Sequence, residues 1–406
     1  MSHHSLAALP PKGGTRGGLL IWRILIAVAL GIGLGYVLPL PVVRAFMTFN
    51  GIFSQFISFL VPLIIVGLVT PAICRMGKGA GRMLLLTFLL AYGSTLIAGI
   101  FSYASSSTVL PSLISPDAAL AASTASTAVE PFFTLAIPPI LDVMTALVSA
   151  FIFGIFLNMS DGKALTAVFY DLERVVTLAI SKILIPLLPL FIFGIFLKMS
   201  YTGEAGPIMQ VFAKVILFIF ALSIVYILAL FIIAGLIGRR NPFRAVLTML
   251  PAYVTALGTS SSAATIPVTL AQAKKCGVRP EVAGFTIPLC ATIHLPGSII
   301  KIVACSLTIM VMQGLPYSFS LFFGFIALLA ITMVAAPGVP GGAIMAAIGL
   351  IASMLGFSET DQALIIALYI VMDCFGTACN VTCDGAISII VDRLKKVKSE
   401  RVNSEE

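Results

Sequence analysis

The chain has 406 residues, of which 59% are hydrophobic and 10% are charged, and its mean hydropathy is +1.12. A soluble domain carries about 25% charged residues because a surface in water must be largely polar, so the composition excludes one. It also excludes disorder, collagen and coiled coils, which need low hydrophobicity or a compositional period. Long unbroken apolar runs exclude a membrane β-barrel, whose strands alternate in polarity. The sequence predicts an all-α polytopic membrane protein.

The 24 Lys and Arg residues exceed the 16 Asp and Glu residues and give a net charge of +8. The basic residues lie in short loops between apolar runs, as in the cytoplasmic loops of membrane proteins, so no nucleic-acid partner is expected. The seven cysteines lie mostly within apolar runs and lack the paired spacing of zinc ligands. Neither disulfides, zinc nor any other resident cofactor is expected.

Six apolar runs follow a polar N-terminal tail of residues 1–18, and each is near or above the roughly 20 residues that cross a bilayer. They are residues 19–40, 52–73, 83–103, 133–157, 175–197 and 208–237, within a six-span part of residues 19–240. Basic residues cluster in alternate loops, at 12–23, 75–82, 163–174 and 239–244. Residues 104–131, by contrast, contain no Lys or Arg, and their only charged residues are two acidic ones. This asymmetry predicts a cytoplasmic N-terminus, and a C-terminal tail of residues 393–406 on the same side.

The pattern changes after residue 240, where two apolar stretches are broken by small and polar residues. Residues 245–273 are interrupted by Gly-Thr-Ser-Ser-Ser at 258–262 and are basic at both ends, so both ends are expected in the cytoplasm. Residues 321–354 are interrupted by Ala-Pro-Gly-Val-Pro-Gly-Gly at 336–342. Two such re-entrant hairpins at corresponding places are typical of secondary transporters with inverted repeats. A transport core over 241–392 would contain hairpin 1 (243–275), span 7 (281–312), hairpin 2 (321–357) and span 8 (361–391), giving eight spans in all.

The last predicted span carries polar residues at its centre. Asp373, Thr377, Asn380 and Asp384 recur at intervals of three and four, so they lie on one helix face. A carboxylate at the bilayer centre costs about 3 kcal/mol or more unless it has a partner. Two carboxylates on one stripe therefore indicate a binding site, and the alternative is a polar clamp between helices.

With these motifs the chain resembles the dicarboxylate/amino acid:cation symporter family, which includes glutamate transporters and neutral amino acid exchangers. Three segments carry the resemblance: Thr-Ser-Ser-Ser-Ala-Ala-Thr-Ile-Pro at 259–267, Gly-Val-Pro-Gly at 338–341, and the polar stripe of the last span. The resemblance implies an elevator-type transporter, a homotrimer in the cell (inner) membrane, with spans 1, 2, 4 and 5 as a scaffold. Spans 3 and 6 would move with the transport core.

The resemblance also implies roles for individual residues. Asp373 would pair with a substrate ammonium, and the tip at 338–341 would act as a gate. Asp384 would bind sodium, helped by the backbone carbonyls of Cys290, His294 and Asn380. The implied substrate-binding residues are Ser261, Ser262, Gly338, Val339, Pro340, Gly341, Asp373, Gly376, Thr377 and Asn380.

The chain departs from the family pattern in its seventh span. The family's Asn-Met-Asp-Gly-Thr is His-Leu-Pro-Gly-Ser at 294–298, so two side-chain sodium ligands are missing, and Ala91 replaces a tyrosine near Ser94. Lys301 follows in an apolar setting, where it either snorkels to an interface or acts as a tethered cation beside Asp373 or Asp384. Coupling to fewer sodium ions, or partly to protons through His294 or Lys301, is expected.

These features predict a symporter for a small neutral amino acid, coupled to sodium and/or protons. Acidic relatives have an arginine where this chain has Gly376, so serine, threonine, alanine or a bulkier substrate using the space at Gly376 is expected. A C4-dicarboxylate or acidic amino acid symporter is the alternative. A receptor that does not transport, or an intramembrane hydrolase pairing Ser261 or Ser262 with Lys301 or His294, ranks lower.

Overall fold

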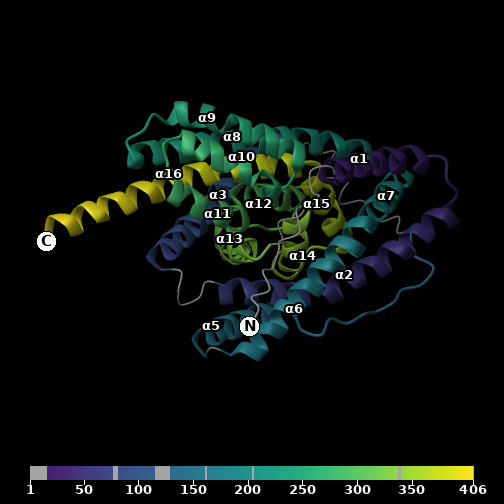
Figure 1. Ribbon diagram of the computed structural model, residues 1–406. Coiled ribbons are helices and arrows are strands. Elements are labelled where there is room, and N and C mark those ends of the chain that lie inside the picture. Colours follow the sequence, from purple (N-terminus) through teal and green to yellow (C-terminus); the bar gives the residue numbers. More distant parts are fainter. Residues whose placement is uncertain are drawn as a thin grey trace.

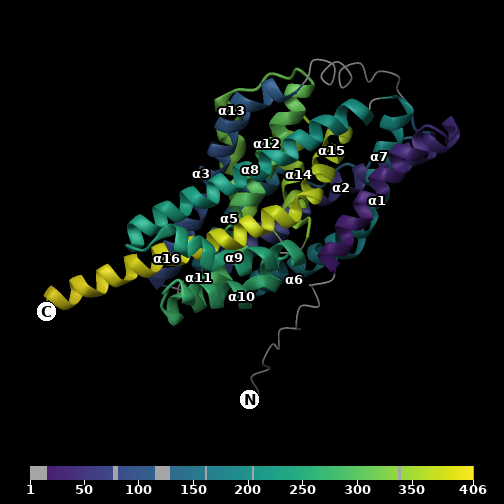
Figure 2. The same cartoon turned by 90° about the horizontal axis from the view of Figure 1, so that it is seen from above.

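The computed structural model describes residues 16–75, 81–114, 129–160, 162–203, 205–336 and 340–405, and every regular element within these ranges is a helix. Figures 1 and 2 show the helices gathered in one body, from which the C-terminal end of α16 projects. The predicted all-α fold is confirmed. The helices are α1 (Arg16–Gly35), α2 (Leu40–Arg75), α3 (Gly81–Leu113), α5 (Val143–Ser160), α6 (Lys163–Ala179), the π-helical turn η1 (Ile180–Leu184), α7 (Ile185–Tyr201), α8 (Ala205–Gly238), α9 (Pro242–Thr259), α10 (Ser262–Lys275), α11 (Pro280–Ile293), α12 (Pro296–Met312), α13 (Phe319–Val334), α14 (Gly342–Leu355), α15 (Glu359–Val371) and α16 (Asp373–Glu405).

Several helical segments have the length and apolar character of membrane spans. Among the described residues there are six, namely Leu40–Pro71, Met83–Leu113, Lys163–Tyr201, Ile208–Gly238, Pro280–Met312 and Asp373–Lys395. Large apolar side chains such as Leu217, Phe243 and Leu247 are exposed on the outside of the body, as expected of a surface that faces lipid. The protein is therefore a membrane protein, while the total of eight spans stays a prediction.

The helix boundaries differ from the predicted spans in three places. The predicted fourth span, 133–157, starts too early, because residues 129–142 are irregular and α5 begins at Val143. Pro138 and Pro139 explain this, since each lacks an N–H and holds the preceding residue out of the helical region. The predicted loop at 163–174 is helical, and α16 continues through most of the predicted tail to Glu405. Hydropathy marks only the apolar part of a helix, so polar extensions are missed.

Each predicted hairpin segment is a pair of helices, α9 with α10 and α13 with α14, and both flanking spans are broken. That the pairs re-enter the membrane stays a prediction. α9 and α10 meet at Ser260, which has a left-handed φ of 48°, and α14 begins after Gly341, which has a φ of 74° that glycine adopts without strain. α11 and α12 are separated at His294 and Leu295, and α15 and α16 are separated at Met372. Four chain breaks therefore leave helix ends available for polar contacts.

The helices pack in two groups. α1 packs against α7, and α2 packs against α5, α6 and α7. α3, α8 and the helices from α9 onward pack mainly against one another, with α16 in contact with α3, α8, α9, α10, α11 and α12. The groups meet where α2 contacts α13 and α14 and where α1 and α7 contact α15. The division into scaffold and transport core, and their relative motion, stay predictions.

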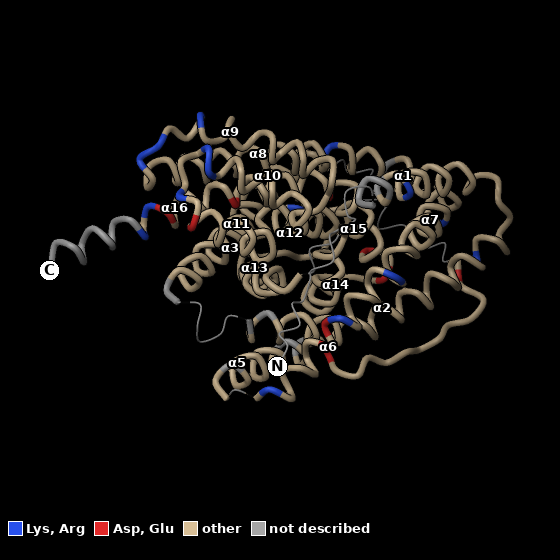
Figure 3. The backbone as a smooth tube through the Cα atoms, viewed as in Figure 1, with Lys and Arg blue, Asp and Glu red and all other residues tan. Residues whose placement is uncertain are grey.

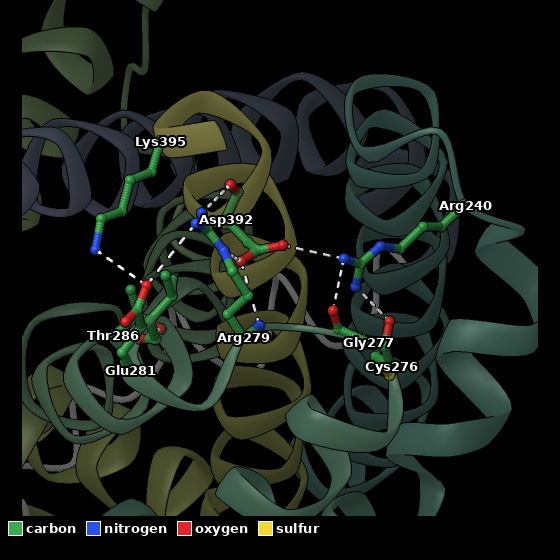
Figure 4. Close-up of polar contacts among 9 residues, drawn as sticks. Arg240, Cys276, Gly277, Arg279, Glu281, Thr286, Asp392 and Lys395 are labelled. Carbon is green, nitrogen blue, oxygen red and sulfur yellow. Dashed lines mark hydrogen bonds and ion pairs between the residues drawn. The ribbon is translucent and has the colours of Figure 1, made fainter. Parts of the chain in front are cut away.

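Charged residues are sparse along the tube, and many Lys and Arg residues gather near the ends of α8, α9 and α16 (Figure 3). At this end Asp392 of α16 is buried and binds two arginines (Figure 4), through Arg240 Nη2 at 3.0 Å and Arg279 Nε at 2.8 Å. Arg240 also donates to the backbone carbonyls of Cys276 and Gly277. Asp392 therefore ties both ends of the α9–α10 hairpin to α16.

Asp392→Asn is expected to lower the free energy of unfolding by about 1.5–3 kcal/mol, because charge-assisted hydrogen bonds to two guanidinium groups are lost. Glu281→Gln is the matched control, since this neighbouring carboxylate is 65% exposed in its ion pair with Lys395. An exposed pair contributes about 1 kcal/mol or less. Thermal unfolding of both variants in one detergent measures the difference, and equal shifts would contradict the role of Asp392.

Candidate functional site

The hairpin tips and the broken helices meet around a small cavity with a partly polar lining. The tip of α9–α10, the second tip near α14, and the breaks in the α11–α12 and α15–α16 pairs all contribute to its walls. Hydroxyl and amide groups dominate the polar part of the lining. The lining residues are Ser260, Ser262, Ala291, Thr292, Leu295, Ser298, Ala336, Ala343, Tyr369, Asp373, Thr377 and Asn380.

Asp373, the first residue of α16, has partners for both carboxylate oxygens. Oδ1 lies 3.2 Å from Nζ of Lys301 on α12, and Oδ2 accepts a 2.9 Å hydrogen bond from the backbone N–H of Gly341. Asp373 is 5% exposed. The break before α16 thus places one carboxylate between two other elements, and both of its contacts neutralise or solvate its charge.

Lys301 is buried rather than directed to a membrane surface. Its side chain is 1% exposed, and Nζ lies 3.6 Å from the ring centroid of Tyr369 and 3.5 Å from the carbonyl oxygen of Met372. The ion pair, the cation–π contact and the carbonyl together replace the lost water. The snorkelling alternative for Lys301 is therefore wrong, and the alternative that places its ammonium beside Asp373 describes this geometry.

Gly376 lies directly under the Lys301 side chain. A Cβ atom at Gly376 would lie 2.3 Å from Cε and 2.4 Å from Nζ of Lys301. The predicted free space at Gly376 for a bulkier substrate is therefore wrong, because Lys301 fills it. Lys301 of the seventh span thus places its ammonium next to Gly376, the position in the eighth span that has no basic side chain.

A hydrogen-bond network holds the other polar residues of the stripe. Asn380 accepts from the backbone N–H of Gly297 at 2.7 Å through Oδ1 and donates to Ser298 Oγ at 3.3 Å through Nδ2. Tyr369 donates to the same Ser298 hydroxyl at 3.0 Å. The Thr377 hydroxyl donates to the carbonyl of Asp373 in its own helix. The first turn of α12 is thereby fixed to α15 and α16.

The serine side chains at the tip of the α9–α10 hairpin have two roles: one caps a helix and the others line the cavity. Ser261 is the N-cap of α10, and its hydroxyl accepts from the backbone N–H of Ala264 at 3.3 Å. Ser262 and Ser260 line the cavity, and the buried Ser260 hydroxyl has no hydrogen-bond partner among the described residues. The predicted substrate contact of Ser261 stays untested, and Ser260 was missed because a run of serines does not reveal which one adopts the left-handed turn.

At the second tip, the predicted residues Gly338 and Val339 lie outside the described residues. Pro340 and Gly341 are described, and Gly341 places its N–H on Asp373. A backbone donor at the start of α14 favours a negative group there, since the N-terminal N–H groups of a helix lack intrahelical partners.

A second buried cluster lies around Asp384. His294 Nδ1 lies 2.9 Å from Asp384 Oδ1, and His294 Nε2 lies 2.9 Å from Ser94 Oγ, which also lies 2.8 Å from Tyr226 Oη. The imidazole thus sits between the carboxylate and the hydroxyl that span 3 supplies. The sequence did not predict this use of the ring, because Ser94 and His294 are 200 residues apart.

Asp384 keeps one oxygen for a further partner. Oδ2 is buried and has no hydrogen-bond partner within the described chain. A buried carboxylate oxygen without a donor is costly, so this atom suits a cation, and oxygen is the donor that sodium prefers. The carbonyl of Cys290 already accepts from the His294 N–H at 2.9 Å, although a carbonyl has a second lone pair. The free Asp384 Oδ2 is the feature of this cluster that suits a cation, and sodium binding here stays a prediction.

The model of the sodium:dicarboxylate symporter family matches residues 20–394. The chain belongs to this family, and the predicted resemblance is confirmed. Its members are secondary transporters rather than enzymes. The hydrolase alternative needs Lys301 or His294 as a base beside Ser261 or Ser262. In the structure Lys301 instead contacts Asp373, and His294 contacts Asp384 and Ser94.

Relatives of the chain include amino acid transporters of different kinds. It is 34% identical to mouse excitatory amino acid transporter 3 over 173 residues, which is 41% of this chain and 32% of that protein. It is 28% identical to rat neutral amino acid transporter B(0) over 170 residues, 41% of this chain and 30% of that protein. The chain thus spans about a third of these mammalian relatives. Serine/threonine transporter SstT of Acinetobacter baumannii (strain AYE) is 25% identical over 388 residues, 92% of this chain and 96% of that protein.

Proposed function

We propose that the protein is a secondary transporter that imports a small neutral amino acid, coupled to a sodium gradient, a proton gradient or both. The observation that carries this proposal is the buried Lys301–Asp373 ion pair beside a cavity lined with hydroxyl and amide groups. The name of the relative that matches along nearly its whole length, a serine/threonine transporter, supports the same substrate class.

Charge balance is the physical reason for a neutral amino acid. The pair is neutral overall, and an amino acid zwitterion is also neutral, so its entry adds no net charge to a buried site. Its ammonium can bind Asp373, and its carboxylate can bind the hydroxyl and amide groups that line the cavity, among them Ser260, Ser298 and Asn380. A substrate with excess charge would leave that charge uncompensated, which is costly away from water.

A second candidate, an acidic amino acid or C4-dicarboxylate, is favoured by one observation. The ammonium of Lys301 lies against Gly376, where acidic relatives are expected to carry an arginine. One lysine could therefore take a side-chain carboxylate, but Asp373 would then face an anion. We rank this candidate second.

The coupling cation is assigned to Asp384. Its free Oδ2 would bind sodium with the backbone carbonyls of Cys290, His294 and Asn380, and the His294 ring beside Oδ1 would reduce the number of ions bound. The trimer, the elevator motion, the location in the cell membrane and cytoplasmic termini are further parts of the proposal. They rest on family resemblance and on the positions of basic residues.

Uptake into proteoliposomes tests the function. The purified chain is expected to accumulate radiolabelled serine, threonine or alanine when a sodium or proton gradient is imposed, and dissipating the coupling gradient should abolish accumulation. Unlabelled serine should compete at least about tenfold better than aspartate or succinate, as expected for one or two uncompensated charges.

The same assay separates the alternatives. Preferential competition by succinate or aspartate would support the second candidate. Saturable binding of an amino acid without accumulation would support a receptor. Either result would overturn the proposed neutral amino acid symport.

A further inference from the structure

Asp373 is held by the protein's own groups at both oxygens, and these groups come from two separate elements. Lys301 belongs to α12 of the broken seventh span, whereas Gly341 belongs to the hairpin tip that begins α14. A single buried carboxylate therefore connects α12, α14 and α16. A group that binds Asp373 can therefore change the position of Gly341 at the start of α14.

The ammonium of Lys301 has the same chemical form as the α-ammonium of an amino acid. Both are R–NH₃⁺ groups with three N–H donors, so one can replace the other on Asp373 without a change in local charge. When displaced, Lys301 keeps two partners, the ring of Tyr369 at 3.6 Å and the carbonyl of Met372 at 3.5 Å. These contacts let the ammonium remain buried while Asp373 changes partner.

We infer that Lys301 stands in for the substrate ammonium on Asp373 whenever no substrate is bound, which lets the unloaded carrier close its tip and return across the membrane. This inference rests on the proposed function. It gives the transporter net uptake that needs no amino acid on the opposite side, rather than obligatory exchange of one amino acid for another.

The physical reason is the cost of an unpaired carboxylate. Without Lys301, Asp373 would have a cation only when substrate is present, and the unloaded form would carry an uncompensated charge through the apolar region. In the substrate-loaded form the substrate ammonium pairs with Asp373, and the substrate carboxylate is hydrogen-bonded by the cavity lining, so the Asp373 carboxylate is not left unpaired. Loss of Lys301 should therefore slow the return of the unloaded carrier. The rate at which the substrate-loaded carrier crosses the membrane, in either direction, should be unchanged.

The test compares two transport modes in proteoliposomes that contain the full chain. Net uptake is the entry of labelled serine into vesicles without internal serine, and exchange is its entry into vesicles preloaded with unlabelled serine. In the wild type we expect both modes to proceed at similar rates. In Lys301→Met, net uptake should fall at least about tenfold relative to exchange.

Lys214→Met is the control, because this lysine lies on the exposed surface of α8 and donates to the carbonyl of Leu113. It should leave the ratio of net uptake to exchange unchanged. Size-exclusion chromatography checks that the Lys301 variant is folded. If it does not fold, the wild type can still overturn the inference, because exchange without net uptake would contradict it.

Two results would overturn the inference: exchange without net uptake in the wild type, or an equal loss of both modes in folded Lys301→Met. Failure of the proposed function looks different, since the wild type would then transport serine in neither mode.

Discussion

Asp373→Asn is expected to abolish uptake of a neutral amino acid. Asparagine keeps the size of the side chain but cannot pair with the substrate ammonium, and it leaves the buried Lys301 without its anionic partner. Removing one member of a buried charge pair costs about 3 kcal/mol in binding, so uptake should fall by about 100-fold or more. Initial rates in proteoliposomes at fixed substrate concentration measure this loss.

A double variant separates the functional effect from a folding defect. Asp373→Asn alone leaves an uncompensated ammonium and should lower the thermal unfolding midpoint, whereas adding Lys301→Met removes that charge and should restore much of the stability. Uptake should remain absent in the double variant. An Asp373→Asn variant that transports at more than about a tenth of the wild-type rate would refute the ammonium-binding role.

Gly297→Ala is expected to reduce uptake strongly, because the first turn of α12 lies directly against α16. A Cβ atom at Gly297 would lie 2.5 Å from the carbonyl oxygen of Gly376 and 2.7 Å from Cβ of Cys379. The two backbones would have to separate, and the bond from the Gly297 N–H to Asn380 would lengthen. A displacement of this kind costs about 1–3 kcal/mol, and small misplacement of a binding group costs about 100-fold in rate.

Gly284→Ala is the matched control for Gly297→Ala. Gly284 lies in the neighbouring helix α11, and no atom lies within 4 Å of a Cβ placed there. Alanine stabilises a helix interior by about 1 kcal/mol relative to glycine, so this variant should transport normally and unfold at a slightly higher temperature. Equal loss of uptake in both variants would show that separation of α12 from α16 is not the cause of the loss in Gly297→Ala.

Much of the fold follows from local sequence, because hydropathy and helix-breaking residues act over a few turns. The apolar runs predicted the membrane helices, and the serine-rich and Gly/Pro-rich breaks predicted both hairpins. The three- and four-residue spacing placed Asp373, Asn380 and Asp384 on one helix, which is how α16 presents them to its neighbours. Local signals failed where prolines ended a helix inside an apolar run, before Val143, and where helices continued into polar sequence.

The partners of the buried charges were decided only by tertiary packing. Lys301 and Asp373 are separated by 72 residues, and His294 and Asp384 by 90, so no local pattern specifies either pair. Sequence alone left Lys301 free to snorkel, and it assigned His294 a role through its backbone. The break at Met372 and the close approach of α12 to Gly376 bring the lysine to the carboxylate, and α3 brings Ser94 to the imidazole. A buried charge binds whichever opposite charge or dipole the packed helices place beside it, because water cannot serve as its partner there.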